Sequence, residues 1–130
     1  MKKSKIIIVI SLCLVIALFV SSYLVYNSLF PLAPPIEVPD RNQIISVTYI
    51  LPDGTITENE YDMDFAPKVD VLAYLEHARP TRIMSVNDSP DVADYYTISY
   101  VCVEKTYTYY LYESNGKNYA EIPYVGVYEV

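Results

Sequence analysis

Two arginines and a run of short polar residues between Ala78 and Asp91 form the segment of this sequence best suited to contact another molecule. Arg79 and Arg82 are two of only six basic residues after residue 30. A guanidinium can hold a carboxylate or phosphate through two parallel hydrogen bonds, so this pair could grip an anionic ligand. The same arginines could instead pair with Asp88 or Asp91 and fix the loop to the rest of the protein. We favour that structural pairing, because the surrounding acidic residues already supply partners.

Tyrosines form the second candidate contact surface, since ten of the fifteen follow residue 94. An extended strand places Tyr107 and Tyr109 on one face. Tyr110 and Tyr112 then lie on the other face. One set completes a core, and the other either pairs across strands or offers rigid aromatic area to a partner. The predicted partner-binding residues are Arg79, Arg82, Asn87, Asp88, Asp91, Tyr110 and Tyr112.

Catalytic residues, a metal site and a cofactor are not predicted. The single histidine, His77, falls near the end of a helix pattern, where a solvated side chain is favoured by the helix dipole. Cys102 lies in a strand pattern typical of a buried, unreactive thiol. The oxygen-rich segments at 62–64 and 87–91 lack the spacing of a calcium-binding EF-hand loop, and such residues ordinarily cap turns.

An envelope hydrolase is the least favoured function. It requires two carboxylates in one cleft, and only Glu104 and Glu113, on neighbouring predicted strands, could supply them. We therefore predict a protein that is not an enzyme.

The charge distribution divides the chain at residue 30. Three lysines give the first thirty residues a charge of +3, whereas sixteen acidic residues against six basic ones give the remainder −10. Nucleic-acid binding requires clustered basic residues, so the acidic remainder argues against that function and against adhesion to anionic lipid. A cationic partner is compatible with this charge.

Residues 6–30 are almost uniformly apolar and directly follow the basic segment 1–5. About twenty such residues in a helix cross the hydrocarbon of a bilayer. Because basic residues are retained on the cytoplasmic side, residues 1–5 are predicted to be a cytoplasmic head and everything after Phe30 to be extracytoplasmic. The predicted location is the plasma membrane, with the lipid bilayer as the partner of residues 6–30.

Two alternatives to an uncleaved signal-anchor stay open. Small residues at Val20-Ser21-Ser22 resemble a signal-peptide cleavage site, but the apolar run continues to Phe30, beyond the usual length of a signal peptide. Cys13 suggests a lipid-modified cysteine, but Leu12 stands where a bacterial lipobox has a small residue. The uncleaved helix is therefore the favoured interpretation.

The rest of the chain is predicted to be a spacer followed by one domain. Four prolines in residues 31–43 favour an extended spacer that lifts a domain of residues 44–130 off the membrane. Hydrophobic alternation in residues 44–51, the turn residues Pro52-Asp53-Gly54 and the segment 55–61 predict a β-hairpin.

One helix is predicted to follow the hairpin. Pro67 suits its first turn, Asp64 suits its N-cap, and Pro80 ends it. Its apolar stripe at helical spacing consists of Val71, Leu72, Leu75 and Ala78.

The remainder reads as strands after a polar segment at 81–94. The Asn115-Gly116 pair is a strong hairpin-turn signal. Strands grouped around a single helix predict an α+β fold, in which an antiparallel, tyrosine-rich β-meander packs one face against the helix. The predicted strands are residues 95–104, 106–113, 119–122 and 124–128.

The strings ARPTRIMSVNDSPDVADYYTI and LYESNGKNYAEIPYVGVYEV resemble a family of small, uncharacterised bacterial lipoproteins and membrane-anchored proteins, mainly of Gram-positive bacteria. The resemblance covers residues 44–130. It implies a domain at the cell envelope and no assigned activity. The chain departs from the lipoprotein members because it lacks a lipobox, which leaves the uncleaved helix as the anchor.

Taken together, these patterns predict a single-pass membrane protein whose outer domain is a binding module for an envelope protein or peptide. The alternative is an accessory sensor or immunity-type protein that captures cationic peptides, for which the acidic domain would supply electrostatic steering.

Overall fold

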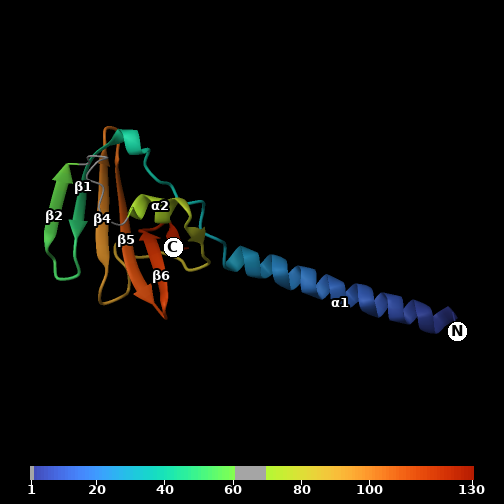
Figure 1. Ribbon diagram of the computed structural model, residues 1–130. Coiled ribbons are helices and arrows are strands. Elements are labelled where there is room, and N and C mark those ends of the chain that lie inside the picture. The colour runs from blue at the N-terminus through green and yellow to red at the C-terminus, as the bar shows by residue number, and fades with distance from the viewer. Residues whose placement is uncertain (1, 61–69) are drawn as a thin grey trace. The chain divides into compact units, whose positions relative to one another are not determined.

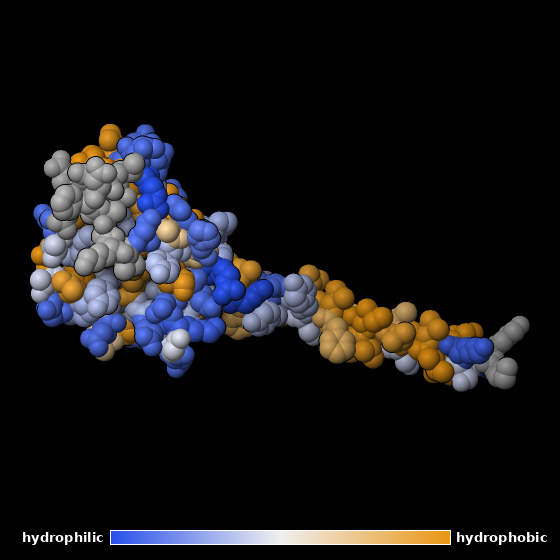
Figure 2. Space-filling view, in the orientation of Figure 1, coloured by the Kyte–Doolittle hydropathy of each residue, from blue (hydrophilic) through white to orange (hydrophobic). Residues whose placement is uncertain are grey.

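The computed structural model describes residues 2–60 and 70–130, with only the backbone of Lys2, Asn59 and Glu60. The chain divides into two compact units, Met1–Leu32 and Ala33–Val130. The first contains one helix, α1 (Lys2–Leu29), whose 28 residues extend about 42 Å. Figure 2 shows apolar side chains along most of this helix, which is long and apolar enough to cross a membrane.

The second unit is built on one antiparallel sheet of seven strands, in the order β2-β1-β4-β5-β6-β7-β3. From β4 to β7 each strand pairs with the next one along the chain, which makes this part a β-meander (Figure 1). The predicted α+β class is confirmed. The elements are a 3-10 turn η1 (Arg41–Gln43), the helix α2 (Val71–Glu76), and the strands β1 (Ile44–Ile50), β2 (Ile56–Glu60), β3 (Arg79–Pro80), β4 (Tyr96–Cys102), β5 (Thr106–Ser114), β6 (Lys117–Ile122) and β7 (Gly126–Glu129).

One face of the sheet forms the core together with α2. Leu72 and Leu75 of α2 are almost fully buried, as the apolar stripe predicts. Tyr109 of β5 and Tyr128 of β7 are 1% and 0% exposed and belong to the same cluster. Tyr109 is therefore a core residue, whereas Tyr110 and Tyr112 of the same strand alternate to the opposite face.

Two predicted turns are confirmed because their residues supply the backbone conformations that tight turns require. Between β5 and β6, Asn115 and Gly116 have φ values of 53° and 73°, the left-handed conformation needed in a two-residue hairpin. Between β1 and β2, Gly54 has φ of 84°, and the Asp53 carboxylate accepts a hydrogen bond from the Thr55 N–H at 2.8 Å.

Helix α2 is shorter than predicted. Asp70 caps it, and its carboxylate accepts a hydrogen bond from the Ala73 N–H at 3.3 Å. The predicted cap Asp64 and first-turn Pro67 lie outside the described residues. At the other end the helix stops at Glu76, and Pro80 belongs to β3, which pairs with β7. A proline is accepted there because β3 is an edge strand.

The segment predicted to be a spacer is part of the folded unit, which begins at Ala33 instead of residue 44. The backbone N–H of Ala33 donates to the Thr81 carbonyl at 2.9 Å. The Tyr128 hydroxyl donates to the Pro34 carbonyl at 2.8 Å, and Ile36 packs on the core. Prolines lack a donor but keep their carbonyl acceptors, so a proline-rich segment can still be bonded to a sheet.

A methyl-group swap tests whether Ala33 is packed against β7. A Cβ added at Gly126 would overlap the Ala33 methyl. We expect Gly126→Ala to destabilise the domain by about 1–3 kcal/mol. That corresponds to a loss of roughly 4–8 °C in Tm per kcal/mol. The measurement is thermal unfolding of the full chain in detergent, monitored by the circular dichroism of its tyrosines.

The double variant Ala33→Gly/Gly126→Ala moves the methyl group from residue 33 to residue 126, so the contact again contains one methyl. It should recover most of the lost stability. Ala33→Gly alone provides the single-variant control for the coupling between the two positions. Independent effects of the two substitutions would contradict the observed packing.

Candidate functional site

Residues 81–94 cover the sheet face opposite to α2. This segment has no regular secondary structure but is fixed at both ends. At its start, the backbone N–H and hydroxyl of Thr81 donate to the Val127 carbonyl on β7 at 3.0 and 2.7 Å. Just beyond its end, the Tyr95 ring meets the Tyr110 ring edge-to-face, with ring centres 5.4 Å apart. The loop is therefore a fixed layer over the sheet.

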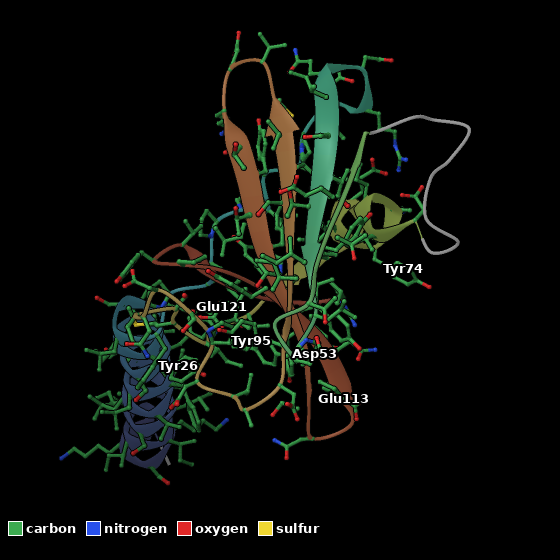
Figure 3. All side chains as sticks on the ribbon, turned by 90° about the vertical axis from the view of Figure 1, so that its left-hand side faces the viewer. Tyr26, Asp53, Tyr74, Tyr95, Glu113 and Glu121 are labelled. Carbon is green, nitrogen blue, oxygen red and sulfur yellow. The ribbon has the colours of Figure 1, made fainter. Side chains whose placement is uncertain are left out.

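Glu121 of β6 is a buried carboxylate beneath this loop, with 6% of its surface exposed. Its Oε1 accepts a hydrogen bond from the Ser85 hydroxyl at 2.7 Å, and its Oε2 accepts one from the Tyr112 hydroxyl at 3.1 Å. Figure 3 shows Glu121 near Tyr95 and on the other side of the sheet from Tyr74 of α2. A buried carboxylate needs such donors, and here they tie the loop to two strands. We call Ser85, Tyr112 and Glu121 the Glu121 cluster.

Ser85 also holds the turn between β6 and β7. Its Oγ accepts a hydrogen bond from the backbone N–H of Tyr124 at 3.2 Å. Tyr124 has φ of 60°, a left-handed conformation that costs a residue with a side chain about 1–2 kcal/mol. Its hydroxyl donates to the Asp88 carboxylate at 2.7 Å, and this hydrogen bond raises the pKa of Tyr124. Loop and turn therefore lie side by side, joined at two points.

Tyr112 stays a hydrogen-bond donor to Glu121 at physiological pH. Burial of the Tyr112 phenol raises its pKa well above the usual range, and the neighbouring Glu121 charge and hydrogen bond raise it further. Burial also raises the pKa of Tyr110, and the nearby Tyr95 and Asp88 act in the same direction. Neither phenol is poised to act as a base.

A cleft of about 360 Å³ lies between the loop and the β5–β6 hairpin. Two carboxylates, Asp91 and Glu121, line it, and no lysine or arginine occurs among its described lining residues. Such a lining favours a ligand that carries both apolar and positively charged groups. The apolar and aromatic part of the lining includes Ile83, Met84, Val86, Val92, Tyr112 and Tyr119.

Three of the predicted partner-binding residues meet in this cleft. Asn87, Asp91 and Tyr112 all line it. Tyr110 lies on the same face of β5, next to Tyr112, and its ring packs against that of Tyr95. The structure thus brings the two segments singled out in the sequence, the polar loop and the tyrosine-bearing strand, to one place. Their role in binding stays a prediction.

The predicted clamp between the arginines and the loop aspartates is wrong for Arg79 and Asp88. Arg79, in β3, pairs with Glu129 of β7 at 3.0 Å, and Asp88 accepts from Tyr124. Arg82 is half-buried near the start of the loop. Hydroxyl groups join the loop to the sheet and to the β6–β7 turn, and they donate to a carbonyl oxygen and to the carboxylates of Glu121 and Asp88.

The residues considered for catalysis or metal binding do not converge. His77 is exposed at the end of α2, with its Nδ1 2.7 Å from the Ala73 carbonyl oxygen. Cys102 is buried, which raises the pKa of its thiol. Glu104 precedes β5 and Glu113 lies near its far end, so about 30 Å of extended chain separates them and the nominated hydrolase pair is wrong.

No group of three or more histidine, cysteine, aspartate or glutamate side chains is placed to hold a metal ion in the part of the chain that the structure describes. The oxygen-rich segment at 62–64 lies outside that part.

Comparison with known families identifies the folded unit. Residues 33–129 match the family DUF5301, described as "Domain of unknown function (DUF5300)". The chain belongs to this family. The matched residues coincide with the compact unit, since both begin at residue 33.

One solved structure shares the fold of this DUF5301 domain, an NMR structure of a protein from Ruminococcus gnavus. The two are 24% identical with a TM-score of 0.58, and the match covers 75% of this chain and 91% of that one. No curated protein matches.

Sequence reasoning missed Ser85, Glu121 and Tyr124 of the DUF5301 domain. The alternation of β6 places Glu121 on the face opposite to the core, where a charged residue is ordinarily solvated. Only the loop that covers this face makes Glu121 a buried acceptor, and that contact joins residues 36 positions apart. No local signal indicates it.

Removing the charge of Glu121 should destabilise the domain. In Glu121→Gln one carboxylate oxygen becomes an amide donor, so either Ser85 or Tyr112 loses its acceptor. We expect a loss of about 1–3 kcal/mol in the free energy of unfolding. Denaturant unfolding of the full chain in detergent measures it. Glu113→Gln, which removes an exposed charge from β5, is the matched control and should be nearly neutral; equal effects would show that the cluster contributes nothing.

Proposed function

We propose that this DUF5301 protein is a membrane-anchored, extracytoplasmic binding module, not an enzyme, that captures cationic, partly apolar peptide segments. The anchor is α1, which has the length and composition of a membrane-spanning helix. Lysines at positions 2, 3 and 5 favour a cytoplasmic N-terminus. The DUF5301 domain then faces the outside. This orientation also agrees with the bacterial envelope family that the sequence resembles.

The lining of the cleft carries the proposal. It combines exposed apolar side chains of the loop with Asp91 and Glu121, and its described lining includes no positive charge. The charge of −10 after residue 30 would steer a cationic peptide toward the domain before contact. A cleft of this volume accommodates a few side chains, which suits a short peptide segment.

The geometry of Ser85 favours binding over hydrolysis. Ser85 is an aliphatic hydroxyl in direct contact with the buried carboxylate, the arrangement nearest to a nucleophile and base. However, its side chain is 8% exposed, its proton is directed at Glu121, and its oxygen already accepts from Tyr124. A nucleophile needs a lone pair open to the substrate. Ser85 is engaged as a structural bridge.

Peptide capture predicts a charge-specific loss of affinity. Asp91→Asn should weaken binding of a lysine- and leucine-rich peptide to the full chain in nanodiscs roughly two- to fivefold, the effect of removing one exposed ion pair. Binding should also weaken as salt rises to physiological strength, because salt screens exposed charges. Isothermal titration calorimetry measures both effects.

Asp53→Asn is the matched control, since Asp53 lies in the β1–β2 turn at the other edge of the sheet and Asn preserves its acceptor oxygen. Equal affinities of the two variants, or binding that does not depend on salt, would refute capture in the cleft.

The orientation is tested separately with an engineered cysteine. Val103, in the β4–β5 turn, is 79% exposed, whereas Cys102 beside it is buried. We expect Val103→Cys to react with a membrane-impermeant maleimide on intact cells. Lys3→Cys should react only after the cells are permeabilised. The opposite pattern would place the domain in the cytoplasm, and labelling of the unmodified chain measures the background.

A further inference from the structure

We propose that an exposed apolar edge of the domain rests on the lipid surface of the membrane that α1 crosses. The edge consists of side chains from the loop and from the β6–β7 turn, which we call the apolar rim. The inference rests on the membrane anchoring proposed above but not on peptide capture. The rim residues are Ile83, Met84, Val86, Tyr124 and Val125.

The rim residues come from two segments that hydrogen bonds hold side by side. These residues are between 46% and 65% exposed. The two segments are held together by the hydrogen bond from the Tyr124 N–H to Ser85 and by the one from the Tyr124 hydroxyl to Asp88. Exposed apolar patches of this kind mark contact sites on proteins or membranes.

The short connection keeps Ala33, which lies beside the two rim segments, within reach of the bilayer surface. Ala33, the first residue of the domain, bonds to Thr81 and packs on Gly126. Thr81 is two positions from Ile83, and Gly126 directly follows Val125. Only three residues separate Ala33 from the end of α1 at Leu29, a path of at most about 14 Å. The headgroup layer is itself about 5–8 Å thick.

The chemistry of the rim suits the boundary between lipid and water. Aliphatic side chains gain about 25 cal/mol for each Å² of apolar surface removed from water. Tyr124 adds an amphipathic ring of the type enriched at membrane interfaces. Its left-handed backbone is held by contacts from the loop, and such strain concentrates at functional positions. The acidic domain is not attracted to anionic lipid, so the contact is apolar and independent of salt.

Single tryptophans test the contact directly, because the chain contains no tryptophan. The probe is the full chain in nanodiscs of phosphatidylcholine, without any peptide. We expect Ile83→Trp to emit at shorter wavelength than a solvated tryptophan. We also expect its emission to be quenched when the lipid is brominated on the acyl chain near the headgroup, at low and at high salt alike.

Ile56→Trp is the matched control. Ile56 is 62% exposed and begins β2, at the opposite edge of the sheet. Five strand spacings, about 24 Å, separate β2 from β7. Its emission should be that of a solvated tryptophan and unaffected by brominated lipid.

Unquenched emission from Ile83→Trp would overturn the proposal, as would equal quenching at both positions. Met84→Trp repeats the test should the first variant fail to fold. Recovery of the chain in the discs verifies anchoring independently. Because Ile83 and Met84 also line the cleft, peptide capture is tested on the unmodified chain in the same discs. Failure of the rim and failure of the proposed function are therefore distinguishable.

Discussion

A sheet of seven strands has more surface than helix α2, the one α-helix among the described residues of this domain, can cover. Helix α2 has six residues and is about 9 Å long, whereas seven strands extend across about 29 Å. Tyrosines, which carry large apolar rings, lie on both faces of β5, so both faces need covering. Irregular chain must complete the layer on each side. Most features of the domain follow from that requirement.

Irregular chain brings backbone groups that need hydrogen-bond partners, and tyrosine hydroxyls and buried polar side chains supply them. On the side of α2, the hydroxyls of Tyr109 and Tyr128 bond to carbonyls of the segment that enters from α1. On the other face, the Glu121 carboxylate accepts hydrogen bonds from the hydroxyls of Ser85 and Tyr112. The tyrosine-rich composition thus serves the fold first. The cleft arises where the second covering layer stops short of the β5–β6 hairpin.

Those features that depend on neighbouring residues could be predicted from the sequence. The Asn115-Gly116 turn and the alternation of β5 follow from local backbone geometry, and both are confirmed. The bonding of the proline-rich segment could not be predicted, because Pro34 and Tyr128 are 94 positions apart. Alternation also places Glu121 on a face without revealing that Ser85 covers it. The alternation of a strand thus predicts which face of the sheet a side chain lies on. Whether that side chain is buried depends on residues far away in the sequence.

The attachment of Ala33 has a mechanical consequence. Any tension on the anchor enters the domain where Ala33 bonds to Thr81 and packs on Gly126, beside β3 and β7. Strand β3 has two residues and pairs only with β7, whereas β1 and β4 pair over most of their length at the far side of the sheet. Force would therefore peel the domain open from its weakest edge, and Tyr128, whose hydroxyl ties β7 to the entering chain, is the first core residue to bear it.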